Sequence, residues 1–278
     1  METKIAVISD IHGNLEALKV VLKNISRTRF DEIICLGDVV GYGPDSTKCM
    51  NLLLEIPNIS FILGNHESML LDETTDEKCS ELGKISSKWT KENVDENTKN
   101  IIKSKFHKSI QRGPFLFVHS SYPYDTNWKY AYTPDSYKEN FKISNEIKYI
   151  FLGHTHRAQI FSVSNDYFSR MDNGMKAPGT YEYILNEQDT HYINVGSVGQ
   201  ARDSNSLACY VEITYSNKRL KVKFFKLRYN VWLTYSKIRA SGLGEKIAGF
   251  LIQEKWRRKR YEYTYNWRER LFRQLFKR

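Results

Sequence analysis

The stretch Ile5-Ala6-Val7-Ile8-Ser9-Asp10-Ile11-His12-Gly13-Asn14 sets the pattern on which the rest of the chain is built. Its first four residues form a short apolar, mostly β-branched run, which is typical of a buried parallel strand. Asp10 and His12 follow at the end of that strand, and side chains two residues apart point the same way from an extended backbone. Gly13 allows a tight turn into a helix that begins near Asn14. A carboxylate and an imidazole presented together in this way make half of a metal site.

The same order of an apolar strand followed by polar residues recurs along the chain. Further strands are predicted at 32–36, 60–63, 115–118, 149–152, 191–196, 206–214 and 219–227. Helices are predicted over 14–26, from 45 or 46 to about 55, in most of 68–112, and after the last strand to about 254. Strands that alternate with helices through the first 67 residues indicate an α/β fold with right-handed crossovers.

Composition indicates one large domain or two small ones, with a substantial core. The 278 residues include 42 Lys and Arg against 32 Asp and Glu, which gives a formal charge of +10. The four cysteines form no CxxC pair, and we interpret them as reduced thiols in a cytoplasmic protein. The first strand begins by residue 4, which leaves no room for a signal peptide, and no apolar run approaches the roughly 18 residues of a transmembrane segment.

Five of the predicted strands end in a short polar segment that contains metal-ligand residue types. These residues are Asp10, His12, Asp38, Asn65, His66, His119, His154 and His156. Of the seven histidines, only His107 and His191 lie elsewhere. A single histidine at a strand end is usually a core or surface residue, but the repetition at five strand ends indicates one shared site. We interpret His107 as a surface residue, and His191 as a residue of the core or of the shell behind the site.

The residue types fit a pair of metal ions. Mixed imidazole and carboxylate ligands suit Mn, Fe, Zn, Co or Ni better than Ca or Mg, and Mn is the ion we expect. Two divalent ions, two carboxylates and a bridging hydroxide leave a charge of about +1, which attracts a phosphate group. Such a pair lowers the pKa of the shared water and holds both oxygens of an in-line displacement at phosphorus. His66 follows Asn65 directly and points elsewhere, so it is free to act as general acid toward the leaving oxygen.

Taken in order, the five strand-end blocks resemble the calcineurin-like metallophosphoesterase superfamily. The blocks are Asp10-x-His12, Gly37-Asp38, Gly64-Asn65-His66-Glu67, His119 and Gly153-His154-Thr155-His156. A small prokaryotic phosphodiesterase-like branch is similar also at 37–44, Trp89-Thr90, 194–203, Arg228-Tyr229-Asn230 and Gly242-Leu243. The resemblance covers about residues 1–254. It implies an αββα sandwich of two mixed β-sheets flanked by helices.

The resemblance also implies how the ligands are divided between two ions. Asp10, His12 and His156 are expected on one ion, Asn65, His119 and His154 on the other, and Asp38 on both. It implies hydrolysis of phosphodiesters or phosphomonoesters, of nucleotides or nucleic acid, by a hydroxide that bridges the metals. His66 and Asp38 are then the catalytic residues, and Asn65 is a substrate contact. Arg202 follows a Gly-rich turn, and we interpret it either as a substrate contact or as part of a turn salt bridge with Asp203.

The chain departs from the superfamily pattern near the site. Protein phosphatases of the superfamily carry an Arg just after the second block, where this chain has Val39-Val40-Gly41-Tyr42; this difference disfavours a phosphoprotein substrate. Ser120 replaces a common Gly, and 164–190 is expected as a surface excursion near the mouth of the site. Neither change removes a ligand. A second class of function, a metal-binding scaffold without catalysis, stays open, but His66 with a full ligand set favours the enzyme.

The chain ends in a basic, aromatic segment at 255–278, which we separate from the domain at 1–254. It holds ten Lys or Arg against two Glu and supplies most of the net charge. Seven aromatic residues are interleaved with the basic ones. Three interpretations stay open: an arm that binds nucleic acid, an amphipathic helix that docks on a partner, a second copy or an anionic membrane, and a helix folded onto its own domain.

Overall fold

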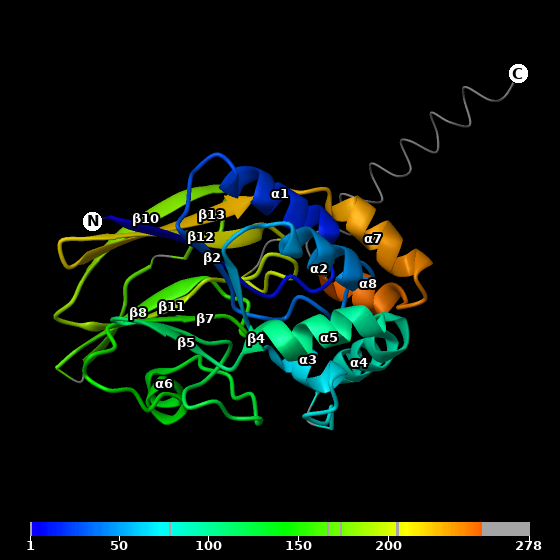
Figure 1. Cartoon of the computed structure of the whole chain (residues 1–278), viewed down its shortest axis with the longest axis horizontal. Coiled ribbons are helices and arrows are strands. Elements are labelled where there is room, and N and C mark those ends of the chain that lie inside the picture. The colour runs from blue at the N-terminus through cyan, green and yellow to red at the C-terminus, as the bar shows by residue number, and fades with distance from the viewer. Residues whose placement is uncertain (1, 78, 166, 173, 204–205, 252–278) are drawn as a thin grey trace, which may run out of the picture.

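The computed structural model describes residues 2–77, 79–165, 167–172, 174–203 and 206–251, and two β-sheets lie face to face within it (Figure 1). The first sheet has the order β10 (Gly179–Asn186), β13 (Arg219–Leu227), β12 (Ala208–Ser216), β1 (Thr3–Ile8), β2 (Glu32–Cys35), β3 (Ile59–Ile62) and β4 (Phe106–His107). The second has the order β5 (Ile110–Arg112), β6 (Phe115–Phe117), β7 (Tyr149–Leu152), β11 (Thr190–Asn194), β8 (Gln159–Ser164) and β9 (Tyr167–Arg170). Both sheets are mixed, because β1 to β4 and β6, β7 and β11 pair in parallel while the remaining pairs are antiparallel.

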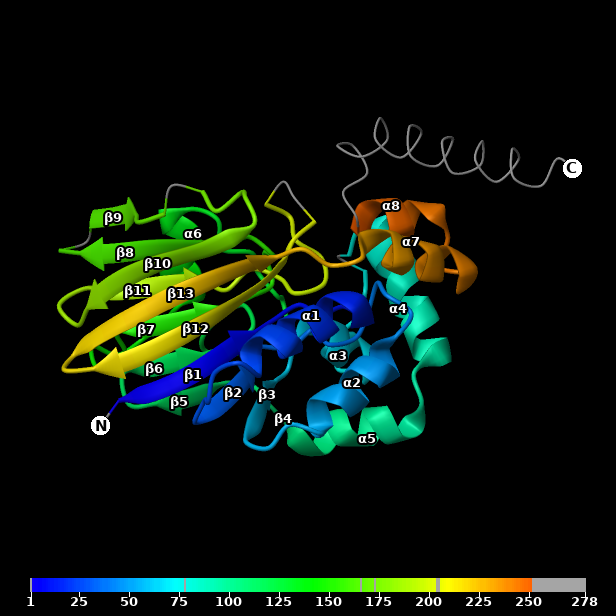
Figure 2. The ribbon, with the colours of Figure 1, turned by 90° about the horizontal axis from the view of Figure 1, so that it is seen from above.

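Helices cover both outer faces and one end of the sandwich. They are α1 (Leu15–Ile25), α2 (Ser46–Leu54), α3 (Asn65–Leu70), α4 (Glu81–Asn93), α5 (Glu96–Lys105), α6 (Pro134–Asn140), α7 (Val231–Ala240) and α8 (Glu245–Leu251). Figure 2 shows α2, α3, α4, α7 and α8 gathered at the end of the molecule toward which β1, β2 and β3 run. The carboxyl ends of these strands therefore face a helical cluster rather than open solvent.

Successive side chains of a strand point to opposite faces of its sheet, and this alternation explains the layers of the fold. In β1, Ile5 and Val7 pack in the cluster between the two sheets, and Ala6 and Ile8 pack in the cluster that includes α1, since successive side chains point to opposite faces. Complete burial of an Ile or Val side chain contributes about 1.5–3 kcal/mol. A third cluster, around Tyr137 of α6, covers the outer face of the second sheet. These layers confirm the αββα sandwich that the sequence predicted.

The first helix follows the sequence signals closely. The Asn14 side chain accepts a hydrogen bond from the backbone N–H of Ala17 at 3.1 Å, which satisfies one of the free donors at the helix start. Leu18, Val21 and Ile25 then lie buried on one face. The turn between β1 and α1 is thereby held in place at both ends, and this turn carries His12.

Two segments contain strands that the sequence analysis did not predict. The described residues of 164–190 lie mostly at the surface, as expected, but the segment forms β9 and β10 and the end of β8, and β10 extends the first sheet through eight-residue pairing with β13. In β10, Tyr181, Tyr183 and Leu185 face the inter-sheet core, an alternation that the flanking glycine and proline obscured. Residues 68–112 contain not only helices but also the short strands β4 and β5.

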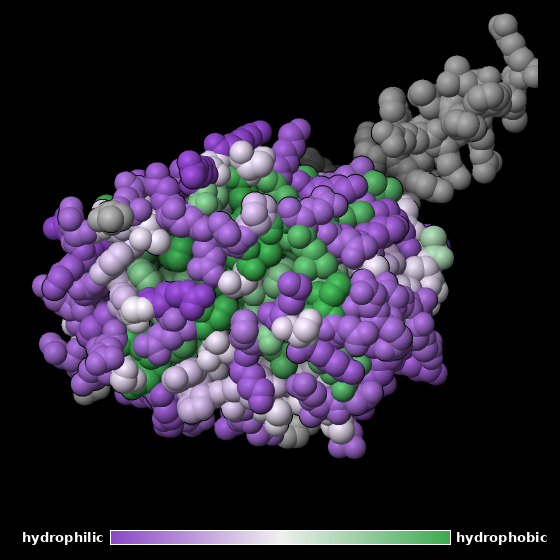
Figure 3. Space-filling model, in the orientation of Figure 1, coloured by the Kyte–Doolittle hydropathy of each residue, from purple (hydrophilic) through white to green (hydrophobic). Residues whose placement is uncertain are grey.

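The proposed second unit, 255–278, lies outside the described residues, so the division at 254 stays a prediction. None of the helices in the described part of the chain has the length and apolar character that a membrane span requires. On the face seen in Figure 1, hydrophobic side chains gather in the middle, near α1 and α2, inside a hydrophilic rim (Figure 3). A hollow of about 430 Å³ in this region is lined by Leu22, Ile25, Phe30, Leu52 and Ile56 among others.

Candidate metal centre

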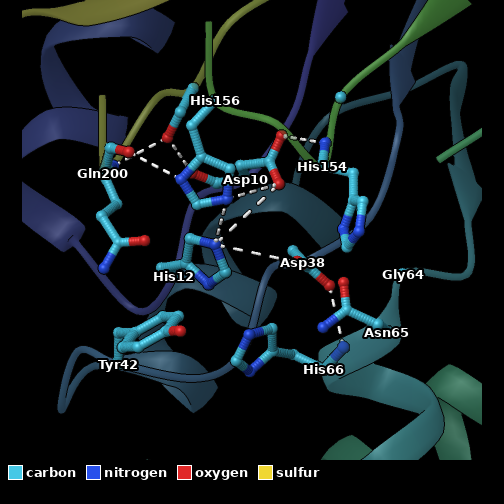
Figure 4. A network of polar contacts seen from close by, with 12 residues as sticks. Asp10, His12, Asp38, Tyr42, Gly64, Asn65, His66, His154, His156 and Gln200 are labelled. Atoms are coloured by element: carbon cyan, nitrogen blue, oxygen red, sulfur yellow. Dashed lines mark hydrogen bonds and ion pairs between the residues drawn. The ribbon is translucent and has the colours of Figure 1, made fainter. Parts of the chain in front are cut away.

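The polar segments after β1, β2 and β7 bring four side chains together at one edge of the sandwich (Figure 4). Asp10, His12, Asp38 and His156 each offer a ligand atom, and these atoms lie within 4.8 Å of one another. Nε2 of His156 is 3.1 Å from Oδ1 of Asp10 and 3.2 Å from Nε2 of His12. All four residues are buried. The parallel strands achieve this because their carboxyl ends meet at the same edge.

A second cluster adjoins the first and shares Asp38 with it. Asp38, His119 and His154 likewise place ligand atoms within 4.8 Å of one another. Oδ2 of Asp38 lies 3.3 Å from Nε2 of His119 and 3.7 Å from Nε2 of His12, so one oxygen faces both clusters. Oδ1 of Asn65 is 3.2 Å from Nε2 of His119. Asp38 therefore lies where a bridging ligand would be required.

Backbone carbonyl groups orient the imidazoles. Nδ1 is hydrogen-bonded to Val40 O in His12 (3.1 Å), to Leu36 O in His119 (2.8 Å) and to Gln200 O in His156 (2.7 Å). In His154 the pattern is reversed, because Nε2 is hydrogen-bonded to Trp128 O at 2.9 Å. A neutral imidazole that donates through one nitrogen presents a lone pair on the other. Nε2 in three of the imidazoles, and Nδ1 in His154, are therefore the ring nitrogens that face the centre.

In each of the two carboxylates, one oxygen accepts a backbone hydrogen bond and the other faces the centre. Oδ1 of Asp38 accepts the backbone N–H of His66 at 2.9 Å, and Oδ2 of Asp10 accepts the backbone N–H of His154 at 3.1 Å. The other oxygen of each carboxylate faces the imidazole nitrogens. One oxygen thus fixes the side chain, and the other is left for a cation.

Five of these residues have a left-handed backbone. The φ angles are 53° for Asp10, 51° for His12, 53° for Asp38, 62° for His154 and 58° for His156. Such a conformation in a residue other than glycine costs about 1–3 kcal/mol and persists only where surrounding contacts impose it. The strain is concentrated at the candidate ligands, as is common at functional sites. Sequence reasoning missed it because glycine, not Asp or His, usually signals this conformation.

Electrostatics indicate that the two clusters fit cations. Burial lowers the pKa of His12 well below its ordinary value and that of His154 to about 3, so both imidazoles are neutral near pH 7. Oδ1 of Asp10 is buried without a hydrogen-bond donor, and lone pairs of His12 and His156 face each other nearby. Burial works against a charge on His119 too, but the Asp38 carboxylate raises its pKa to about 9. Around Asp10, a carboxylate oxygen and imidazole lone pairs converge without donors, which is the ligand set of a divalent transition-metal ion. A cation at the second cluster would displace the proton of His119.

Glu67 has a role that sequence reasoning did not assign. Its buried carboxylate accepts four backbone hydrogen bonds, from Asp38 (2.7 Å), Val39 (2.7 Å), Val40 (3.1 Å) and Gly64 (3.0 Å). A side chain at Gly64 would collide with Asp38 and Glu67. The residue therefore holds the loop that carries Asp38 against the start of α3. The signal was the Gly64-Asn65-His66-Glu67 block itself.

His66 and Arg202 face a cavity of about 680 Å³ that opens onto the two clusters. The His66 ring packs edge-on against the His12 ring at 4.8 Å but belongs to neither ligand cluster. The Arg202 guanidinium donates to Oε1 of Gln200 at 3.0 Å, is hydrogen-bonded to Tyr130, and lies over the Phe250 ring at 5.6 Å. Asp203 forms an ion pair with the buried Lys226. Sequence reasoning missed Tyr130 and Phe250 because no motif marks them.

The other predicted residues lie elsewhere. His107 is exposed in β4, as expected for a surface residue, although its segment is a strand rather than a helix. His191 is buried in β11 and hydrogen-bonded to Ser162 and to Asn186 O, so it is a core residue. Among the described residues of 164–190, none lines the cavity, so the expected position near its mouth was wrong.

A sandwich of this kind with two adjoining carboxylate and imidazole clusters defines a metal-dependent phosphoester hydrolase. The sequence pattern of the calcineurin-like phosphoesterases matches residues 3–158. An uncharacterised protein of Methanocaldococcus jannaschii, MJ0912, is 30% identical over 248 residues, which are 88% of this chain and 96% of that protein. The chain belongs to the calcineurin-like phosphoesterase family.

Two further proteins are similar to this chain, one in structure and one in sequence. The crystal structure of a metallophosphoesterase from Sphaerobacter thermophilus superposes with a TM-score of 0.71 at 27% identity, over 90% of this chain and 98% of that one. A symmetrical bis(5′-nucleosyl)-tetraphosphatase of Wigglesworthia glossinidia brevipalpis is 42% identical over 67 residues, which are 23% of this chain and 25% of that enzyme. The first likeness spans the whole sandwich, and the second covers a short segment only.

Proposed function

We propose that this protein hydrolyses phosphodiester or phosphomonoester bonds of nucleotides or nucleic acid at the candidate metal centre. The observation that carries the proposal is the pair of ligand clusters that share Asp38 at the base of a cavity. Two divalent ions bound there would polarise a phosphate group and lower the pKa of a water molecule. The mixture of imidazole and carboxylate ligands supports Mn, with Fe, Zn, Co and Ni as the other ions that suit it.

The proposed ligands follow the clusters. Asp10, His12 and His156 hold one ion, Asn65, His119 and His154 hold the other, and Asp38 bridges them. Asn65 enters the second set through its amide oxygen, which adds no charge, so the positive charge that attracts phosphate is retained. Its position next to His66 also supports a contact with substrate.

The remaining side chains of the cavity act on the substrate directly. Arg202 is proposed to bind phosphate oxygens, because its guanidinium lies in the cavity beside Tyr42. His66 is proposed to protonate the leaving oxygen. Burial lowers its pKa to about 4, and a bound phosphate would favour the protonated form through its negative charge.

Hydrolysis of bis(p-nitrophenyl) phosphate by the full chain loaded with Mn tests the proposal. We expect turnover by the wild type, and in His66→Ala a loss of at least about 100-fold in kcat with two ions still bound. Elemental analysis of the same samples gives the metal content. An inactive wild type that carries both ions would instead support the metal-binding scaffold, and loss of metal from His66→Ala would mean that His66 is a ligand.

The described cysteines are all free, which fits the predicted cytoplasmic location. That location, and the formation of oligomers, remain proposals. The functions proposed for 255–278 concern residues outside the described part of the chain.

A further inference from the structure

The cavity above the metal centre is lined by two kinds of side chain. We call the charged and ligand residues, including Asp38, His66 and Arg202, the charged side. Met69, Cys79, Leu82 and Phe250 also line the cavity, and we call these four side chains the apolar wall. A phosphate group needs only the charged side. The apolar wall therefore has to serve the group that is esterified to the phosphate.

Phe250 is the aromatic ring of the apolar wall. It comes from α8, close to the end of the described chain, and its side chain is 36% exposed. The ring leans on Tyr42 with centroids 5.7 Å apart, and the Arg202 guanidinium lies 5.6 Å above it. The ring is thus held next to the side chain that we propose to bind phosphate. A planar group attached to that phosphate, through a sugar, would reach the ring.

The faces of the other cavity aromatics are already covered. Tyr130 stacks on His154 with centroids 4.2 Å apart and on Tyr132 at 5.4 Å. The guanidinium of Arg157 lies 5.1 Å from the Tyr132 ring. Tyr130 is 45% exposed, but its ring already stacks on His154 and Tyr132. Phe250 is therefore the ring best placed to stack on a ligand.

Part of the cavity lining is polar. Thr75 and Thr126 place hydroxyl groups there. A plain alkyl or aryl group offers these hydroxyl groups no hydrogen bond, whereas a nucleobase has apolar faces and hydrogen-bonding edges. The volume of about 680 Å³ is also far more than a phosphate group fills and lies within the usual range of ligand pockets.

We infer that the apolar wall binds the base of a nucleoside phosphate, with Phe250 as the stacking ring and the specificity-determining residue. The inference rests on the proposed function, since it assumes that phosphate binds at the charged side. It assigns the choice of substrate to α8, far along the chain from the ligand motifs. It also separates recognition of the base from the chemistry at phosphorus.

The test compares AMP with ribose 5-phosphate as inhibitors of bis(p-nitrophenyl) phosphate hydrolysis by the Mn-loaded full chain. The two compounds carry the same phosphate on the same sugar, and only AMP has a base. Stacking of a base on an aromatic side chain is worth roughly 5- to 150-fold, so we expect AMP to inhibit at least about 10-fold more tightly. Equal inhibition by the two compounds would overturn the inference and leave the proposed function intact.

Variants assign the preference to the ring. We expect Phe250→Ala to reduce the ratio of the two inhibition constants to less than about 3-fold, and Phe250→Trp to retain it. Leu233→Ala removes an exposed apolar side chain of the neighbouring α7, outside the cavity lining, and should leave the ratio unchanged. A ratio that survives in Phe250→Ala would contradict the assignment.

Binding distinguishes failure of the inference from failure of the proposed function. If the wild type with both ions bound hydrolyses neither bis(p-nitrophenyl) phosphate nor p-nitrophenyl phosphate, the proposed function fails. Calorimetric titration of the same protein with AMP and with ribose 5-phosphate then measures the base preference without turnover. Tighter binding of AMP that depends on Phe250 would still support the base site, and equal binding would overturn it.

Discussion

Glu67 is the side chain on which the position of the bridging residue depends. Its two oxygens accept the backbone N–H groups of three successive residues in the loop after β2 and of Gly64 before α3. Asp38 lies in that loop and, among the described residues, is common to both clusters. A carboxylate that accepts four donors is a rigid clamp, because each donor is buried and would be costly to leave unpaired.

Replacement of Glu67 by Gln should loosen this clamp. The amide nitrogen would face backbone donors, so we expect a loss of about 2–4 kcal/mol in the free energy of unfolding of the metal-free protein, measured with urea. Divalent-ion affinity should fall by about 10- to 100-fold, as for other residues that orient ligands. The exposed Glu73→Gln variant is the matched control. Unchanged ion affinity in Glu67→Gln would contradict the positioning role.

His191 offers a pH-dependent contribution to stability that is separate from the metal centre. It is buried, stacked on Tyr149 at 5.5 Å, and hydrogen-bonded to Ser162 and to the carbonyl of Asn186. Burial lowers its pKa below the ordinary value of 6.5, although Asn186 and the nearby Asp189 oppose this shift. The folded protein therefore prefers the neutral imidazole.

The preference for a neutral His191 imidazole determines how its contribution to stability changes with pH. The unfolded chain binds the proton first, so the contribution of His191 is complete above about pH 6.5 and is lost as the pH falls toward the lowered pKa. We expect the unfolding free energy of wild type minus that of His191→Gln to decrease by about 1 kcal/mol between pH 7 and pH 5. Urea titrations of both proteins at each pH measure it. A difference that stays constant over this range would contradict the assignment.

At the level of secondary-structure elements, α7 is tied to the loops that carry the site. Nζ of Lys237 contacts Glu16 of α1 and, at 2.8 Å, Asp45, the residue before α2. Asp45 precedes α2, but its carboxylate makes no cap hydrogen bond and binds Lys48 and Lys237 instead. Both acidic side chains are mostly buried. The ion pair thus links the C-terminal helices to the turn after His12.

Removal of the Lys237 cation should lower the free energy of unfolding. We expect Lys237→Met to reduce the free energy of unfolding by about 1–2 kcal/mol at pH 7, between the values for exposed and for buried pairs. Lys221→Met breaks the exposed pair with Glu182 on the first sheet and should change stability by less than about 1 kcal/mol. Equal effects of the two variants, measured by urea unfolding, would mean that burial of the pair adds nothing.

Elements differed in how well the sequence predicted them. β1, β2, β3, β6, β7, β11, β12 and β13 lie within two residues of the predicted strands. Apolar runs mark most of these strands, and alternating apolar and basic residues mark β13. β10 was missed although Tyr181, Tyr183 and Leu185 alternate toward the core. The glycine and proline at its start are typical of loops. Its pairing with β13 is a non-local contact, which no local sequence pattern reveals.

Charge is unevenly distributed over the whole molecule. Residues 255–278 carry a net charge of +8 out of +10, so 1–254 is close to neutral. If the segment is an arm for nucleic acid, its removal should weaken RNA or DNA binding and reduce the dependence of log K on log salt concentration, because fewer counterions are released. Fluorescence anisotropy at several salt concentrations measures both quantities. Identical slopes with and without 255–278 would contradict the nucleic-acid interpretation.

The amino-acid sequence by itself determined the α/β class, the strands that carry the ligand types, and the order of the ligand blocks, because each of these is written in local runs and spacings. Asp10, His12, Asp38, His119, His154 and His156 could all be named as candidates in this way. Only the tertiary structure decided which nitrogen of each imidazole faces the centre, and that five of the candidate ligands have a left-handed backbone. It also decided that Glu67 clamps the loop of Asp38, and that Arg202 and Phe250 meet in the same cavity as His66. Those features depend on contacts between segments far apart in the chain, and no local spacing encodes a non-local contact.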